Sequence, residues 1–229
     1  MATRPLYIPL DSFPYVEEKY VEFDWHAGFS MSQKQKSIAS WHYQVKALNY
    51  AENPLEVSSK SEDNTGVALS AFNLKITLAS GKDIAVENIF QASKMFERGG
   101  PFKDLLAVSP LEAKRDIRLK DSGDMVGFQG KEGIWPLEPK TLFYDWVYIN
   151  ALHRNPHLVE KIKEYDAFTD IEFNPAKSFN CQARSVALYL AFIRLGKIEE
   201  VISSSDYYRQ LMTISSDTPS SIPVQQSLI

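Results

Sequence analysis

The segment ENIFQASKMFER, residues 87–98, carries side chains that could bind and cleave a polar substrate. If it is an α-helix, with about 100° between successive residues, one narrow face collects Glu87, Gln91, Lys94 and Arg98. An acid beside cations and an amide suits general acid–base chemistry and the binding of an anion. A solvated helix face, whose ion pairs contribute ~0.2–0.5 kcal/mol each, has the same pattern. The spacing alone leaves both interpretations open.

Two lysines stand where another helix is expected to begin. Ser32 and Gln35 have the spacing of a capping box. Lys34 and Lys36 would then lie beside the free N–H groups of the first turn, which favour negative charge. The helix dipole and the like charge disfavour the protonated amine, so either lysine could act as a nucleophile. A charged lysine would instead bind a diphosphate, and a surface lysine without a function is a further interpretation.

Composition sets limits on the class of protein. The chain has 229 residues, 44% hydrophobic and 24% charged, which suffices for one stable domain. The net charge of −4 argues against a protein that coats nucleic acid nonspecifically, although a local basic groove is compatible with it. Cys181 is the one cysteine, so no intrachain disulfide can form. Because no signal peptide and no apolar run of ~20 residues is visible, we expect a soluble cytoplasmic protein without a membrane association.

The elements that must position these residues can be predicted from periodicity. Residues 5–25, rich in proline and aromatics, suit an extended arm or an edge strand. Residues 74–86 alternate about Ser80 and Gly81, which predicts a β-hairpin. We therefore expect a predominantly helical α+β single domain with a small antiparallel β element.

Helical periodicity begins at Val86 and dominates the second half of the chain. Ser109 and Pro110 open a further helix with a capping box. More helices are expected over residues 141–153, 157–165 and 181–196, the last of them buried. We expect the domain to comprise residues 1–202 with its N-terminal arm. The polar residues 203–229 have the composition of a flexible tail.

The amino-acid sequence of the central region resembles that of a known family. The run AFNLKITLASGKDIAVENIFQASKMF, followed by SPLEAKR, is similar to the NADAR (YbiA-like) superfamily signature of S-N-F, a hairpin, E-H-Y-F-Q-A-x-K-F and P-x-E-A-K-R. The residues that fall on this signature are Glu87, Phe90, Gln91, Ala92 and Lys94. Further segments look like the DarT-associated NADAR antitoxins: GFSMSQKQKSI, PLEVSSKS, GVALSAFNL, FERGGPF and AFTDIEFNPAKSFNCQARS. The resemblance covers roughly residues 5–200.

The resemblance implies an activity and its partners. In this family a toxin transfers ADP-ribose from NAD to guanine in DNA, and the NADAR protein removes it as an ADP-ribosyl hydrolase. The implied partners are ADP-ribosylated DNA, ADP-ribose and the cognate DarT toxin. The resemblance also implies that the reaction needs no cofactor. We expect single-stranded DNA, because the exocyclic amine of guanine in a duplex is covered in the minor groove. Alternatives are an N-glycosidase of a riboflavin-pathway intermediate and a non-catalytic module that binds ADP-ribose or the toxin.

Glycosidic chemistry needs a carboxylate near the anomeric carbon and a proton for the leaving nitrogen. Glu87 is the first candidate because it matches the signature acid. Asp170 is the second, in a DIEFNP loop that replaces the D-x-x-W-G loop of the wider family, and Glu172 is the alternative acid there. An acid in this loop could equally hold the turn before the last helix.

A lysine could form a Schiff base with the ring-opened anomeric carbon, which water then resolves. Lys36 and Lys34 rank ahead of Lys60, a rival that precedes the segment matching the start of the superfamily signature.

Substrate binding is assigned by the same resemblance and by local chemistry. Short polar side chains in the S-N-F-like turn suit ribose or phosphate oxygens, and the free N–H groups at the start of the last helix suit a diphosphate. Asn180 could also be a simple N-cap. A conserved family tryptophan has two counterparts, Trp135 and Trp146, of which Trp135 is expected in a loop facing a base. The binding set is Ser70, Asn73, Phe90, Gln91, Lys94, Trp135, Asn180, Gln182 and Arg184. The four histidines are scattered, so no metal site is expected.

Overall fold

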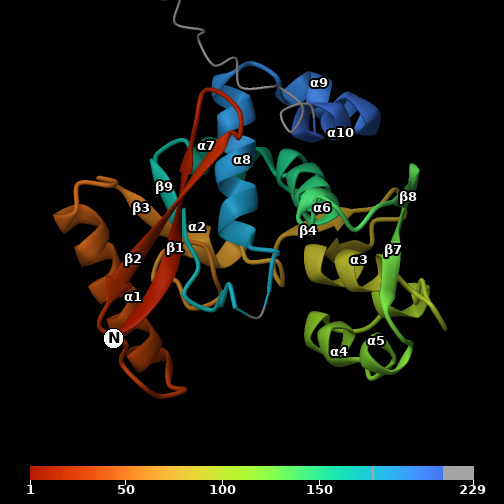
Figure 1. The fold of residues 1–229 in the computed structure, drawn as a ribbon, viewed down its shortest axis with the longest axis horizontal. Helices are drawn as coiled ribbons and strands as arrows, with labels where there is room; N and C mark the ends of the chain where they lie inside the picture. The colour runs from red at the N-terminus through yellow and green to blue at the C-terminus, as the bar shows by residue number, and fades with distance from the viewer. Residues whose placement is uncertain (177, 214–229) are drawn as a thin grey trace, which may run out of the picture.

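A computed structural model describes residues 1–176 and 178–213 as a single α+β domain (Figure 1). Helix accounts for 43% and strand for 19%, so the predicted class is confirmed in outline. The prediction of one small antiparallel β element was too narrow, because these residues form three sheets, one of them mixed and four-stranded.

The four-stranded sheet has the order β2-β1-β9-β3. Its strands are β1 (Ala2–Pro9), β2 (Val16–Phe23), β3 (Pro54–Glu56) and β9 (Ala167–Thr169). The predicted N-terminal arm is the antiparallel β1–β2 hairpin, in which β2 is an edge strand and β1 is not. β3 and β9 run parallel, with Glu56 opposite Thr169. Parallel strands need a long crossover, so a short-range pattern could not predict this pair.

The other two sheets are small and antiparallel. The predicted hairpin over residues 74–86 is confirmed as β4 (Lys75–Thr77) and β5 (Asp83–Ala85). Gly81 takes a φ of +80° in its turn, a conformation that glycine adopts without steric cost. The third sheet has the order β6-β7-β8, with bounds Lys94–Phe96, Met125–Gly130 and Gly133–Trp135.

The helices surround and connect these sheets. Their bounds are α1 Met31–Ala47, α2 Asn64–Ala68, α3 Val86–Ser93, the 3-10 helix η1 Lys103–Leu106, α4 Pro110–Arg115, α5 Arg118–Asp121, α6 Leu142–His153, α7 Pro156–Ile162, α8 Gln182–Arg194, α9 Ile198–Ser203 and α10 Ser205–Thr213. The predicted capping box of α4 is confirmed, since Ser109 accepts from the Glu112 N–H and the Glu112 side chain accepts from the Ser109 N–H. The helices expected over residues 141–153, 157–165 and 181–196 are α6, α7 and α8.

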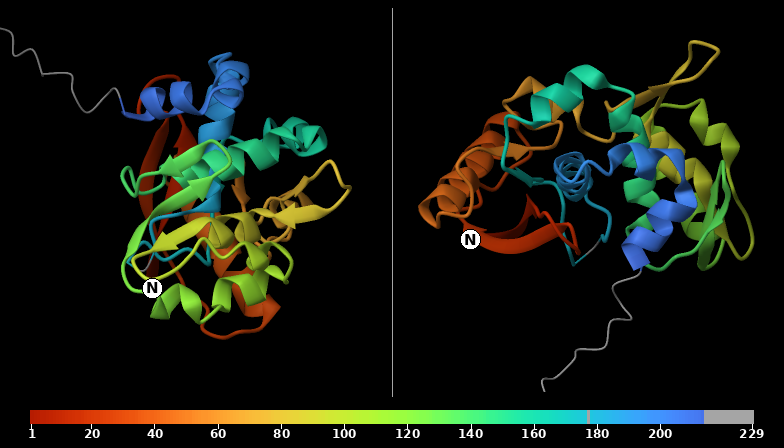
Figure 2. Two further views of the ribbon diagram at one scale, coloured as in Figure 1. Left: turned by 90° about the vertical axis from the view of Figure 1, so that its right-hand side faces the viewer. Right: turned by 90° about the horizontal axis from the view of Figure 1, so that it is seen from above.

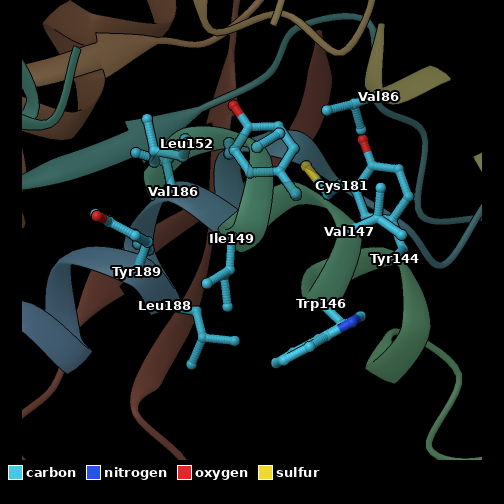
Figure 3. Packing of buried hydrophobic residues seen from close by; sticks show 14 of the residues in the cluster. Val86, Tyr144, Trp146, Val147, Ile149, Leu152, Cys181, Val186, Leu188 and Tyr189 are labelled. Carbon is cyan, nitrogen blue, oxygen red and sulfur yellow. The ribbon is translucent and has the colours of Figure 1, made fainter. Parts of the chain in front are cut away.

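The core lies where α6 packs against α8. Seen from above in Figure 2, α8 stands end-on near the middle of the molecule, with the β1–β2 hairpin on one side and α6 on the other. Figure 3 shows side chains of both helices pointing toward one another, including Ile149 of α6 and Leu188 of α8. These side chains are buried, so both helices are fixed in place by the hydrophobic effect.

Three predicted boundaries were wrong. α1 begins at Met31 with Ser30 as its N-cap, two residues earlier than the expected capping box at Ser32. α3 ends at Ser93, and Lys94 already belongs to β6, so the helical face does not extend to Arg98. The predicted tail begins with helix α10, whose Tyr208 is fully buried, because its aromatic side chains supply enough apolar area to order it. The rest of that tail, residues 214–229, lies outside the described residues.

Candidate active site

The parallel pairing of β3 and β9 brings two distant loops to one edge of the sheet. The chain leaves β3 into residues 57–60 and leaves β9 into residues 170–172, both at the carboxyl ends of the strands. The Val57 N–H donates to the Thr169 carbonyl at 2.8 Å, which keeps the two exits side by side. Carboxyl ends of adjacent parallel strands are a common place for ligands in α/β proteins.

A cavity of about 690 Å3 opens at this edge, between these loops, α3 and α4. It is termed the Glu87 cavity. Figure 1 shows the elements that contribute to its wall, with α3 and α4 on one side of the molecule and the loop that follows β9 nearer the middle. The residues that line it are Ser58, Ser59, Lys60, Ser70, Ala71, Phe72, Glu87, Phe90, Gln91, Lys94, Leu111, Lys114, Arg115, Tyr144, Asp170, Glu172, Phe173, Asn174, Ser178, Asn180 and Gln182.

Glu87 is the buried carboxylate of this cavity. It lies in the first turn of α3 and is 5% exposed. Its Oε1 accepts a hydrogen bond from Gln91 Nε2 at 2.8 Å and lies 3.8 Å from Lys114 Nζ. Glu87 and Gln91 share one face of α3 as predicted, but the cations beside them, Lys94 and Lys114, come from β6 and α4, and Arg98 is not among the residues that line the cavity.

Cations surround the carboxylate on more than one side. Lys94, at the junction of α3 and β6, places its Nζ 4.8 Å from the centre of the Phe90 ring. Burial lowers the pKa of the Lys94 amine, while the Glu87 charge raises it and the Lys114 charge lowers it further. Lys60 and Arg115 also line the cavity. Such a set suits a ligand with phosphate oxygens.

Three buried polar atoms of the cavity wall have no hydrogen-bond partner within the described part of the chain. They are Ser70 Oγ, Gln91 Oε1 and Asn180 Oδ1. A buried polar atom without a partner costs about 1–3 kcal/mol, so such atoms are uncommon in folded proteins. Their position around one cavity leaves them available to a ligand there. Gln182, by contrast, is occupied, because it accepts from the Ala71 N–H and donates to the Val57 carbonyl.

Asp170 is the second buried carboxylic acid at the cavity. Its Oδ1 accepts from the Glu172 N–H at 3.0 Å, and its Oδ2 lies 3.9 Å from Cys181 Sγ. Burial, and next to it the charge of Glu56, raise the pKa of Asp170 well above its ordinary value. Asp170 thus lines the cavity, as predicted. Its hydrogen bond with the Glu172 N–H also holds the turn, which was the alternative role predicted for an acid in this loop.

Aromatic side chains form the remaining wall. Tyr144 of α6 meets Phe90 edge to face at a ring distance of 5.0 Å. Burial raises the pKa of Tyr144 well above its ordinary value, and the charges of Glu87 and Asp170 add to the shift. Tyr144 therefore lies within electrostatic reach of both acids. Phe72 and Phe173 complete the apolar surface, on which a base or ribose face can pack.

The lysines of α1 lie outside the cavity wall. Because the helix begins at Met31, the Lys34 N–H already bonds the Ser30 carbonyl, and both lysines lie past the free N–H groups. Lys34 Nζ pairs with Glu172 Oε1 at 3.1 Å and lies 4.7 Å from the Trp25 ring centre. Lys36 is exposed. Of the three lysines proposed as nucleophiles, Lys60 lines the cavity, whereas Lys36 and Lys34, which the sequence ranked ahead of it, do not.

Three predicted binding residues are also outside it. Asn73 is exposed and donates to the Val67 carbonyl, because the turn directs it away. Trp135 lies in β8 and is 0% exposed, packed in the aromatic core, so it cannot face a base. Arg184 is paired with the buried Asp145, which occupies its guanidinium. Local spacing gave no information about these tertiary partners.

Several cavity residues were not predicted. Lys114 and Arg115 belong to the SPLEAKR segment that carried part of the resemblance, so a signal for them was present. Glu56, fully buried behind Asp170, belongs to the PLEVSSKS segment. Tyr144 had no local signal, because α6 is apolar all round.

A second hollow of about 680 Å3 lies between the β4–β5 hairpin, α3 and α6, and it is lined by Trp146, the alternative to Trp135 as the family tryptophan. Within residues 1–176 and 178–213, His, Cys, Asp and Glu side chains form no group of three or more that could hold a metal ion. In the same residues, each helix is too short or too polar to cross a bilayer.

Comparison with known proteins gives one match. The profile of a family described as the DarT1-associated NADAR antitoxin matches residues 2–221, which is nearly the whole chain. No curated protein matches the sequence.

Proposed function

The chain belongs to the DarT1-associated NADAR antitoxin family, and on this premise we propose that it hydrolyses the bond between ADP-ribose and a guanine base of DNA. The family name associates it with a DarT1 toxin, whose modification the reaction would reverse. The cavity volume of about 690 Å3 falls within the range of small-molecule sites. Single-stranded DNA is the proposed substrate, because an extruded guanine can enter such a cavity and a stacked one cannot.

The observation that carries the proposal is the set of three unpartnered polar atoms in a cavity that also holds two buried acids. Ser70, Gln91 and Asn180 supply hydrogen-bonding atoms for ribose hydroxyls. Lys94, Lys114 and Arg115 would bind the diphosphate. The aromatic wall around Tyr144 would pack against a base.

The two acids divide the chemistry. Glu87, beside Lys114, stabilises the positive charge that develops at the anomeric carbon as its bond to the guanine nitrogen breaks. Asp170 gives a proton to the leaving nitrogen, and its carboxylate then accepts a proton from the attacking water. Free ADP-ribose and unmodified guanine are the products, and Asp170 ends the cycle protonated.

The test is incubation of the full chain with a guanine-ADP-ribosylated single-stranded oligonucleotide, followed by mass analysis. We expect release of ADP-ribose, and a loss of about 10²–10⁴-fold in kcat for Glu87→Gln. Glu160→Gln removes a surface carboxylate of α7 and is the matched control. Binding without release by the wild-type protein would contradict the proposal and would identify a module that only binds ADP-ribose.

A covalent variant of the mechanism uses a cavity lysine. Lys60 or Lys94 would displace the guanine amine from the ring-opened anomeric carbon, and water would resolve the Schiff base. Borohydride added during turnover would reduce this intermediate, and peptide mass analysis would locate it. Full turnover without an adduct, in the presence of borohydride, would exclude the covalent variant and leave direct hydrolysis.

A further inference from the structure

Glu56 is a fully buried carboxylate to which the proposed mechanism assigns no role. It ends β3, and both of its oxygens accept from the Ile171 N–H, at 3.0 and 3.2 Å. Its Oε2 also accepts from the Thr169 hydroxyl at 2.9 Å, and the Ser58 hydroxyl bonds it too. Gly66 of α2 packs against its backbone so closely that an added Cβ would lie 1.9 Å from the Glu56 carbonyl oxygen.

The hydrogen bonds around Glu56 all point toward it. The Thr169 hydroxyl lies 2.9 Å from Glu56 Oε2 and 3.3 Å from the Leu55 carbonyl, and it has one proton to donate to either of these acceptors. In both cases Thr169 Oγ1 is left to accept in its 3.0 Å contact with His42 Nε2, so we assign the Nε2–H tautomer to His42. A chain of donors thus runs from α1 through β9 to Glu56. A carboxylate that accepts this many donors is best satisfied when ionised.

Asp170 is placed between the two residues that bond Glu56, yet its donors are weaker. The N–H groups of Glu172 and Phe173 stabilise its charge, but among the described residues no hydroxyl bonds it, and the thiol of Cys181 lies 3.9 Å from its Oδ2. Two carboxyl groups buried in one site cannot both carry a charge at low cost. The proton is therefore expected on the acid whose donors are weaker.

We propose that Glu56 is a positioning residue that stays ionised and holds the proton on Asp170 Oδ2, so that Asp170 acts as the acid of the Glu87 cavity. This inference rests on the proposed function for its catalytic consequence, but the state of the proton does not depend on it. In the reaction the proton leaves Oδ2 for the guanine nitrogen as the glycosidic bond breaks. The water that attacks the sugar carbon returns a proton to Oδ2.

Other charged and titratable groups face Asp170. Glu172 adds a second negative charge, and Arg4 of β1 adds a positive one that opposes both acids. Cys181, Tyr144 and Tyr148 also interact with Asp170, and burial raises the pKa of each well above its ordinary value. Burial also raises the pKa of Glu56, but its hydrogen bonds with Ser58, Ile171 and Thr169 counteract that shift. The balance of these groups favours a protonated Asp170.

The test is a carbon-13 NMR titration of the full chain with labelled aspartate carboxyl groups, in which Asp170→Asn identifies one resonance. We expect Asp170 to be protonated at neutral pH, and Glu56→Gln to lower its titration midpoint by about one to three pH units. Glu172→Gln, which removes a half-exposed carboxylate, is the matched control and should move the midpoint by less. The alkaline limb of the pH profile of kcat/KM should move to lower pH by the same amount as the midpoint, and Glu56→Asp should restore part of the shift.

Two outcomes overturn the inference. One is an ionised Asp170 in the wild-type protein at neutral pH, which needs no variant and so does not depend on how Glu56→Gln folds. The other is an equal shift in Glu56→Gln and Glu172→Gln. A protonated Asp170 in a protein that hydrolyses no ADP-ribosylated guanine would support the proton assignment while contradicting the proposed function.

Discussion

Single polar atoms distinguish the Glu87 cavity from the rest of the surface. Ser70 Oγ is buried and has no partner among the described residues, so the folded protein carries the cost of its desolvation. Evolution toward stability alone would replace such a hydroxyl. Because this hydroxyl lies at a cavity, it can bond a ligand there, although it lowers the free energy of unfolding of the free protein.

Ser70→Ala is expected to separate these two effects. Removing the unpartnered hydroxyl should leave the free energy of unfolding equal to or up to about 1 kcal/mol above the wild-type value. The dissociation constant for ADP-ribose should rise about 5- to 10-fold, the cost of one hydrogen bond. Urea unfolding and titration calorimetry measure the two quantities. A variant that is destabilised by more than about 1 kcal/mol, with unchanged binding, would show that Ser70 is structural.

Lys34 illustrates a residue that acts through another. Its ion pair with Glu172 and its contact with Trp25 tie α1 to the loop that carries Asp170. Arg4 contacts the same indole at 5.4 Å and reaches the Ile171 carbonyl. The unusual lysine that the sequence placed near a helix start thus has a structural partner within the site loop.

Lys34→Met is expected to lower kcat/KM about 3- to 10-fold by loosening that loop. The free energy of unfolding should change by about 1 kcal/mol or less, because the Glu172 side chain is 43% exposed and such pairs contribute little. Lys36→Met, two residues along the same helix and exposed, is the control and should leave kcat/KM within about two-fold. Equal effects of the two substitutions on kcat/KM would remove the positioning role of Lys34.

At the scale of elements, the sequence predicted those elements whose contacts join residues close together in the chain, and missed those whose contacts join distant residues. The β4–β5 hairpin and the α4 capping box depend on residues a few positions apart, and both were predicted. The β3–β9 pair joins Glu56 to Thr169 through parallel bonding, and no periodicity records such a pairing. That pair places Lys60 and Asp170 at one edge of the sheet, so the sequence could not show that Lys60, and neither lysine of α1, lines the cavity.

The end of α3 shows a second limit. A 100° pattern continued through Arg98, but Lys94 pairs with Phe128 in β6 and takes the chain out of the helix. Tertiary pairing with β7 overrode the local pattern. Glu87 and Gln91 were predicted correctly because they lie one helical turn apart within α3, where the pattern holds.

A substitution at Tyr208 tests whether packing against the core orders α10. Tyr208 is 0% exposed, lies 5.3 Å from the Trp146 ring and donates to the Leu142 carbonyl at 3.2 Å. Tyr208→Ala should lower the free energy of unfolding by about 3–5 kcal/mol, the cost of a cavity beneath the helix. Tyr208→Phe should cost only about 0.5–1.5 kcal/mol. Denaturant unfolding measures both values, and Tyr43→Ala, at an exposed tyrosine of α1, is the control. If Tyr208→Ala lowers the free energy of unfolding by less than about 1 kcal/mol, α10 is not held by packing, and the prediction of a flexible tail from residue 203 would be favoured again.

At the scale of the whole molecule, the hydrogen-bond chain from His42 through Thr169 to Glu56 also connects the surroundings of the Glu87 cavity to global stability. His42 joins α1 to β9 through Thr169, and burial, with the Lys46 charge as a smaller cause, lowers its pKa to about 4. The unfolded chain protonates this histidine near pH 6.5, while the folded chain resists until about pH 4. Between these values the unfolded state binds more protons, so the free energy of unfolding falls as pH falls.

His42→Gln is therefore expected to flatten the acid side of the stability profile. The wild-type protein should lose up to about 3 kcal/mol between pH 6.5 and 4 through this one group, at about 1.4 kcal/mol per pH unit. The variant keeps a side-chain donor for Thr169 but no titrating ring, so the difference between the two profiles isolates His42 from the carboxylates that both share. Urea unfolding at pH 7, 6 and 5 measures it, with His157→Gln, at an exposed site of α7, as the control. If the His42→Gln and wild-type profiles stay parallel over this range, His42 does not resist protonation in the fold, and the donor chain from α1 to Glu56 loses its first member.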